Sequence, residues 1–144
     1  MIERVLVVCV GNVCRSPMAE ALLARSIPTL SVASAGVGAL VGYSAEPQAC
    51  ALMAARGVDL SMHRARQLSE EIVRSSELIL VMEHSQCAHI ERLMPFSRGK
   101  VHLLGRWGGF EVPDPYKKTL QAFEDALVLI ERGVTDWTYR LGKL

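Results

Sequence analysis

Short runs of Val, Leu and Ile alternate with amphipathic segments along this chain of 144 residues. A run that is apolar at every position is typical of a strand covered on both faces. Strands that alternate with helices indicate a parallel sheet with right-handed crossovers and helices on both faces. We therefore expect a single α/β domain over residues 1–144. The expected strands cover residues 4–10, 31–35, 78–82 and 101–104, and the expected helices begin at residues 17, 47, 70, 85 and 120, with Ser16 and Ser69 capping two of them.

The charge balance and the cysteine content narrow the class of protein. Sixteen Lys and Arg residues against fifteen Asp and Glu residues leave a net charge of +1, which argues against a nucleic-acid-binding protein. The apolar runs are far shorter than the roughly 20 residues that span a bilayer, and the first four residues do not resemble a signal peptide. We therefore expect a cytoplasmic protein without a membrane span, in which the four cysteines are reduced.

The turn after the first strand, residues 9–15, is where chemistry is expected, because ligands bind beyond the carboxyl ends of parallel strands. Its backbone N–H groups and the following helix N-terminus can cradle an anion. Arg15 adds a planar fork for two oxygens of a phosphoryl group, and Gly11 permits a tight turn. Cys9, at the base of this positive site, is expected to be a nucleophilic thiolate that accepts a hydrogen bond from Ser16.

The spacing of Cys9, Arg15 and Ser16 between a strand and a helix predicts a phosphoryl-transfer site rather than a buried cysteine beside an exposed arginine. A phosphate ester also needs a proton for its leaving group. Pro113 and Pro115 stiffen a loop around Asp114, which is the expected general acid and then the base that activates water. An Asp-Pro pair alone indicates only a turn, so this role depends on the loop at residues 9–15.

These segments resemble the low-molecular-weight protein tyrosine phosphatases over nearly the whole chain. The resemblance rests on residues 7–17, Ser34-Ala35-Gly36, Gly57 with residues 63–66, and Asp114-Pro115-Tyr116. It is strongest to the bacterial Wzb-type branch, which accompanies tyrosine autokinases in capsule and exopolysaccharide export. It implies a four-stranded sheet in the order 2-1-3-4 and hydrolysis of phosphotyrosine in protein, with a tyrosine autokinase as the expected partner, through a phosphocysteine intermediate.

The resemblance also assigns roles to residues. It makes Cys9 the nucleophile, Arg15 the phosphate clamp and Asp114 the acid. We expect no metal or other cofactor, because the loop N–H groups and Arg15 already supply the stabilisation of charge in the transition state. Residues matching the phosphate-binding loop are Val10, Gly11, Asn12, Val13, Cys14 and Ser16, and the network that holds this loop in shape adds Ser34 and His63 to Asn12 and Ser16.

Two positions bear on substrate choice. Leu40 stands where many family members have an aromatic residue that stacks on the substrate ring, so Leu40 and Tyr116 are the expected walls of the ring slot. Related arginine phosphatases carry a threonine at the place of Val13, so an apolar Val13 favours phosphotyrosine.

Cys14 raises a redox question, because a loop that curls around one ion can bring its sulfur close to that of Cys9. We expect mild peroxide to form a reversible disulfide between the two, which mass spectrometry can detect. A small buried side chain without redox function is the equally open alternative for Cys14.

Other functions remain as alternatives. A thiol-dependent arsenate reductase of the same fold requires two additional cysteines near the third strand, where only Cys87 is present. A silent phosphotyrosine-binding module would keep Arg15 but has no need for Cys9 or Asp114. His84, Cys87 and His89 do not share one helix face and are not expected to bind a metal. Nothing in the sequence demands a dimer, so we expect a monomer.

Overall fold

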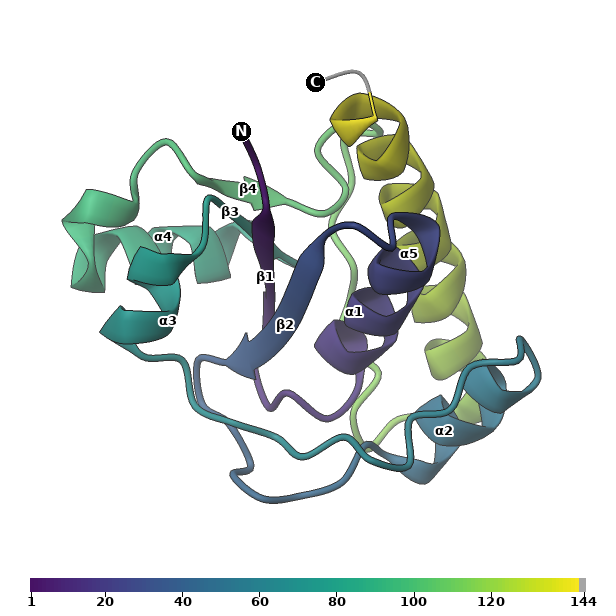
Figure 1. Ribbon diagram of the computed structural model, residues 1–144. Helices are drawn as coiled ribbons and strands as arrows, with labels where there is room; N and C mark the ends of the chain where they lie inside the picture. Colours follow the sequence, from purple (N-terminus) through teal and green to yellow (C-terminus); the bar gives the residue numbers. More distant parts are fainter. Residues whose placement is uncertain (143–144) are drawn as a thin grey trace.

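The structure, a computed structural model, describes residues 1–142. A parallel sheet in the order β2-β1-β3-β4 lies between two layers of helices, which confirms the expected fold class and strand order. Figure 1 shows α1 and α5 on one side of the sheet and α3 and α4 on the other. The strands are β1 (Arg4–Cys9), β2 (Ser31–Gly36), β3 (Leu78–Val81) and β4 (Val101–Leu103), and the helices are α1 (Arg15–Ser26), α2 (Pro47–Ala54), α3 (Glu70–Ser75), α4 (His84–Leu93), the short 3₁₀ helix η1 (Pro95–Ser97) and α5 (Leu120–Leu141).

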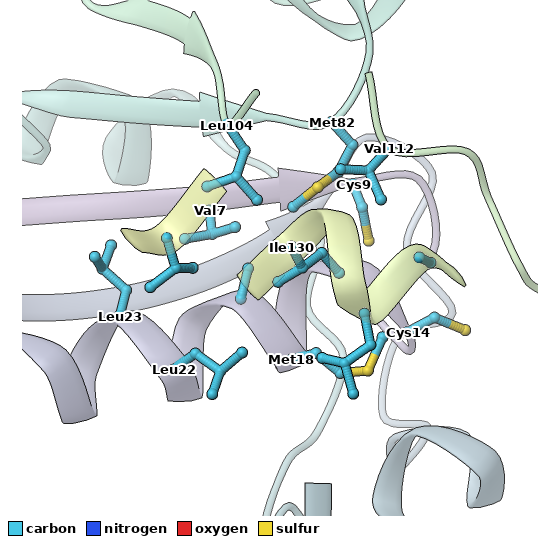
Figure 2. Close-up of a cluster of buried hydrophobic side chains, with 14 of the residues drawn as sticks. Val7, Cys9, Cys14, Met18, Leu22, Leu23, Met82, Leu104, Val112 and Ile130 are labelled. Carbon is cyan, nitrogen blue, oxygen red and sulfur yellow. The ribbon is translucent and has the colours of Figure 1, made fainter. Parts of the chain in front are cut away.

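The central strand β1 divides the core into two clusters because its side chains alternate in direction. Val5, Val7 and Cys9 belong to the cluster on the side of α1 and α5. Leu6 and Val8 belong to the cluster on the side of α3 and α4. Figure 2 shows Val7 and Cys9 on the face that Ile130 of α5 covers. A strand buried on both faces fixes the position of its carboxyl end, from which the loop at residues 9–15 departs.

The strand register places several strand ends at one edge of the sheet. Val8 of β1 lies opposite Ala35 of β2 and Val81 of β3, and Val81 lies opposite Leu103 of β4. The segments that follow these strands therefore leave the sheet on the same side. In Figure 1 the loop between β1 and α1 lies at the end of the molecule opposite the N-terminus and the last turn of α5.

Most element boundaries agree with the sequence, but the start of α1 does not. The helix begins at Arg15 after Cys14, and no side chain caps it, so the N-cap role expected for Ser16 is wrong. Ser69 does cap α3, by accepting a hydrogen bond from the Ile72 backbone N–H. The Ser16 hydroxyl is instead used inside the loop, as described below.

The long helix α5 packs against the core with its apolar face. Phe123, Leu127 and Ile130 are buried, whereas Leu120 is exposed. Trp137 is also buried and donates a hydrogen bond from Nε1 to the backbone oxygen of Leu103, which fixes the far end of the helix to β4. No helix within residues 1–142 combines the length and the apolar character needed to cross a membrane.

Candidate active site

The loop at residues 9–14 turns six consecutive carbonyl groups outward, and each has a hydrogen-bond partner. A peptide carbonyl points opposite to the N–H of the next residue, so the N–H groups of residues 10–15 face the other, concave side of the loop. This arrangement leaves the concave side lined with donors. The carbonyls of Cys9, Val10 and Gly11 accept hydrogen bonds from the backbone N–H groups of Val37, Gly38 and Leu40, respectively. The carbonyls of Val13 and Cys14 accept hydrogen bonds from the backbone N–H groups of Glu46 and Met18. The Asn12 carbonyl accepts one from His63 Nε2 at 2.7 Å.

The close approach between this loop and the end of β2 requires a glycine. A Cβ on Gly36 would lie 2.4 Å from the Val10 carbonyl oxygen and 3.1 Å from the Asn12 nitrogen. Asn12 itself has a positive φ of 59°, a left-handed conformation that Asn tolerates better than most residues. Its side chain holds that conformation, since Oδ1 accepts a hydrogen bond from the Arg66 backbone N–H at 2.9 Å.

The concave side of the loop forms the floor of a cavity of about 110 Å³. The structure brings together there the three residues predicted to do chemistry, Cys9, Arg15 and Asp114. The remaining lining residues are Val10, Gly11, Val13, Cys14, Gly38, Leu40 and Tyr116. The predicted ring walls Leu40 and Tyr116 therefore lie at the same cavity as the predicted nucleophile.

Cys9 is buried, and its Sγ lies 2.9 Å from Ser16 Oγ. Ser16 Oγ also accepts a hydrogen bond from Asn12 Nδ2 at 2.7 Å, so its own hydrogen is free to point at the sulfur. The second hydrogen of Asn12 Nδ2 goes to Ser34 Oγ at 2.9 Å, and the Ser34 hydroxyl donates to Glu20. A donor aimed at Sγ stabilises negative charge on the sulfur.

Hydrogen bonds thus link Asn12, Ser16, Ser34 and His63, the residues that the family resemblance assigns to the network around the loop, and their side chains lie outside the cavity lining. His63 Nε2 contacts the Asn12 carbonyl, which only accepts, so this nitrogen carries a hydrogen and donates it. His63 therefore supports the loop and does not present this nitrogen as a base.

Arg15 is the largest fully buried side chain among the described residues, and its guanidinium pairs with two carboxylates, those of Glu83 and Asp114. Nη1 donates to Glu83 Oε1 at 2.5 Å and to the Val112 carbonyl at 2.7 Å. Nη2 lies 3.5 Å from Asp114 Oδ2, and within residues 1–142 neither Nη2 nor Nε has a hydrogen-bond partner. A buried guanidinium with two free donors on one edge matches two oxygens of a phosphoryl group.

Besides Gly38, which lines the cavity, Glu83 is the site residue that the sequence did not predict. It follows β3 by two residues, and its carboxylate both pairs with Arg15 and caps α4 through a capping box with Gln86. The only signal in the sequence is its place just past a buried parallel strand, at the edge where ligands bind. Its pairing with Arg15 is evident only in three dimensions.

Asp114 lies at the sheet edge as predicted, in the loop between β4 and α5. Its Oδ1 accepts from the Tyr116 backbone N–H at 3.1 Å, and its side chain is 40% exposed. Oδ2 lies 3.5 Å from Arg15 Nη2, and both residues line the cavity. One carboxylate oxygen is thus fixed by the loop while the other is open to a substrate.

Cys14 lines the same cavity as Cys9. Burial and the neighbouring Cys9 raise the pKa of the Cys14 thiol far above its ordinary range, so the Cys14 thiol stays protonated. Oxidative pairing of the two remains a prediction. Cys50 is only partly buried and packs at the margin of the core.

Cys87 does not approach this cavity, since it lines a separate one with His84 and His102. Within residues 1–142 no cluster of three His, Cys, Asp or Glu side chains has the geometry to hold a metal ion.

Comparison with known proteins identifies the family of this chain. Residues 4–144 match the family described as "Low molecular weight phosphotyrosine protein phosphatase". The chain is 51% identical over its full length to the probable low molecular weight protein-tyrosine-phosphatase EpsP of Ralstonia nicotianae, covering 99% of that protein.

Solved structures agree in fold. The tyrosine phosphatase Wzb from Escherichia coli K30, crystallised with sulphate, superposes with a TM-score of 0.95 at 39% identity, over 98% of this chain and 99% of that chain. The YwlE arginine phosphatase from Geobacillus stearothermophilus superposes with a TM-score of 0.92 at 30% identity, over 98% and 94% of the two chains. The protein therefore belongs to the low-molecular-weight protein tyrosine phosphatase family.

Proposed function

We propose that Cys9, Arg15 and Asp114 hydrolyse phosphotyrosine in a protein substrate through a phosphocysteine intermediate. The observation that carries this proposal is their convergence on one cavity, with a supported sulfur, two unpartnered donors of a buried guanidinium and an open carboxylate oxygen. In the first step the Cys9 thiolate attacks phosphorus and the bond from phosphorus to the phenolic oxygen breaks. Protonated Asp114 gives its proton to the departing phenolate.

In the second step water attacks the phosphocysteine. The Asp114 carboxylate takes a proton from this water, the bond from sulfur to phosphorus breaks, and inorganic phosphate leaves with the Cys9 thiolate restored. Arg15 Nε and Nη2 and the loop N–H groups bind the phosphoryl oxygens in both steps. These donors are fixed before the substrate arrives, and such preorganised donors are the main source of stabilisation of a charged transition state.

The substrate ring lies between Leu40 and Tyr116, which line the cavity beside the loop. Val13 also lines it and offers no hydroxyl. This composition supports an aromatic ester over phosphoarginine, although the arginine phosphatases share the fold.

The physiological substrate in this proposal is a tyrosine autokinase of exopolysaccharide or capsule export. It is supported by the likeness to the proteins called EpsP and Wzb. We place the enzyme in the cytoplasm, as a monomeric single domain over residues 1–144.

The test compares the wild type, Cys9→Ser and Cys87→Ser on a phosphotyrosine peptide, with phosphoarginine and arsenate assayed in parallel. We expect turnover of the peptide by the wild type and by Cys87→Ser and none by Cys9→Ser, because Cys87 lies at another cavity. Cys9→Ser should also retain a phosphotyrosine autokinase in a pull-down. Preferred turnover of phosphoarginine, or reduction of arsenate, would replace the proposal by one of those activities.

A further inference from the structure

The cavity wall that carries Leu40 is an irregular segment, residues 37–40, held between two partners. On one side its N–H groups at Val37, Gly38 and Leu40 donate to the carbonyls of the loop at residues 9–11, each at 3.0 Å. On the other side a carbonyl and an N–H point away from that loop. These two groups, the Val37 carbonyl and the Ala39 N–H, are both taken by the side chain of Gln67.

The Gln67 amide uses both of its functional groups. Nε2 donates to the Val37 carbonyl at 2.8 Å, and Oε1 accepts from the Ala39 N–H at 2.9 Å. The backbone of Gln67 is held as well, because the flanking residues pair with Gly36 in a parallel bridge at 2.8–2.9 Å. Backbone pairing between the two segments ends at Gly36, and beyond it the Gln67 side chain makes the hydrogen bonds that a paired strand would make.

Gln67 acts on the cavity without lining it. Gly38 and Leu40 line the cavity, whereas Gln67 is exposed to solvent and is not part of the cavity lining. Leu40 packs closely over the loop, since a Cβ placed on Gly11 would lie 3.7 Å from Leu40 Cδ1. A shift of residues 37–39 would move this wall. The carbonyls of residues 9–11 also bond to this segment, but Cys9 is held in addition by its place in β1, and Arg15 by Glu83 and the Val112 carbonyl.

We propose that Gln67 is a positioning residue that sets selectivity for aryl phosphates by holding Leu40 in the cavity wall. This inference rests on the proposed function, because it concerns the ring-binding side of the same cavity. Only a side chain with a donor and an acceptor at this length can hold both the Val37 carbonyl and the Ala39 N–H. The exposed position means that a substitution removes the two hydrogen bonds without opening a cavity in the core.

The test is Gln67→Met, which keeps the length and loses both hydrogen bonds, with Gln121→Met as the control. Gln121 is an exposed glutamine whose side chain, among residues 1–142, bonds only to Asp125 on the same helix. We expect Gln67→Met to raise the KM for an aryl phosphate about three- to tenfold, the effect of one or two partly exposed hydrogen bonds, with kcat within about twofold. The inhibition constant of inorganic phosphate, which binds in the loop and does not reach the ring walls, should change less than about twofold in Gln67→Met. Gln121→Met should match the wild type in all three constants.

A second comparison shows whether the effect passes through the wall. In a Leu40→Ala background, Gln67→Met should add little to the KM, because the side chain that it positions is gone. An unchanged KM for Gln67→Met, an equal loss of phosphate affinity, or an additive effect with Leu40→Ala would overturn the inference. Failure of the wild type to hydrolyse any aryl phosphate would instead reject the proposed function.

Discussion

Arg15 is a buried cation whose orientation depends on Glu83. The carboxylate of Glu83 is about one-third exposed, yet it receives the shortest hydrogen bond of the guanidinium and leaves Nε and Nη2 free for substrate. Loss of the negative charge would leave the guanidinium held by the Val112 carbonyl and Asp114. Asp114 would then compete with the substrate for the same cation.

We therefore expect Glu83→Gln to lower kcat/KM for an aryl phosphate about tenfold. This is the effect of losing one charge-assisted hydrogen bond whose strength is reduced because the carboxylate is partly exposed. Glu111→Gln is the matched control. Glu111 accepts from the His84 N–H at the same end of α4 but is not paired with Arg15. Equal effects of both substitutions would mean that Glu83 matters only to the helix.

Asp114 combines an oxygen fixed by the Tyr116 N–H with one that is open to the cavity. If it protonates the leaving group, Asp114→Asn should slow release of a phenol with a pKa near 10 about a hundredfold or more. Release of a strongly acidic phenol should fall much less, because that phenolate leaves without a proton. Measurement of the first turnover separates this step from hydrolysis of the phosphocysteine. An equal loss for both phenols would contradict the role of acid.

At the scale of elements, the end of β2 and the loop after β1 approach so closely that only glycine fits at position 36. We expect Gly36→Ala to lower the free energy of unfolding by about 1–3 kcal/mol, because the added methyl group meets the Val10 carbonyl. Chemical denaturation measures this difference. Gly38→Ala serves as the control for stability, since a Cβ there meets no atom within 4 Å. A Gly36→Ala protein as stable as the wild type would show that the approach is looser than described.

The order of strands and helices was predictable because the buried strands are continuous apolar runs, such as Leu78–Val81, whose pattern is local. The role of Ser16 as a cap was not, since a hydroxyl at a helix start usually bonds to the helix and here bonds to Cys9. The roles of Glu83 and Gln67 could not be predicted from the sequence for another reason. Their partners lie 68 and about 30 residues away, so only the fold brings them together.

At the scale of the whole molecule, the loop at residues 9–15 ties together segments that are far apart in sequence. Its carbonyls bond to the segment after β2, to His63 and to Glu46 at the start of α2, while Arg15 bonds to Glu83 after β3. A ligand bound in this loop therefore stabilises contacts between several elements, and its binding free energy adds to that of folding.

Inorganic phosphate at a hundred times its Kd should stabilise the wild type by about 2.7 kcal/mol and raise Tm by roughly 5–10 °C. Arg15→Met should lose most of this rise, because the clamp for the anion is gone. Thermal unfolding with and without phosphate measures both. The same rise in Arg15→Met as in the wild type would show that phosphate binds elsewhere.

The most direct test of the account is rapid quenching of the wild type during turnover of an aryl phosphate, followed by mass spectrometry of its peptides. We predict one phosphoryl group on Cys9, absent after longer incubation without substrate. Turnover with an unmodified Cys9 at every time point, or with the phosphoryl group on another side chain, would contradict the assignment of this sulfur as the nucleophile.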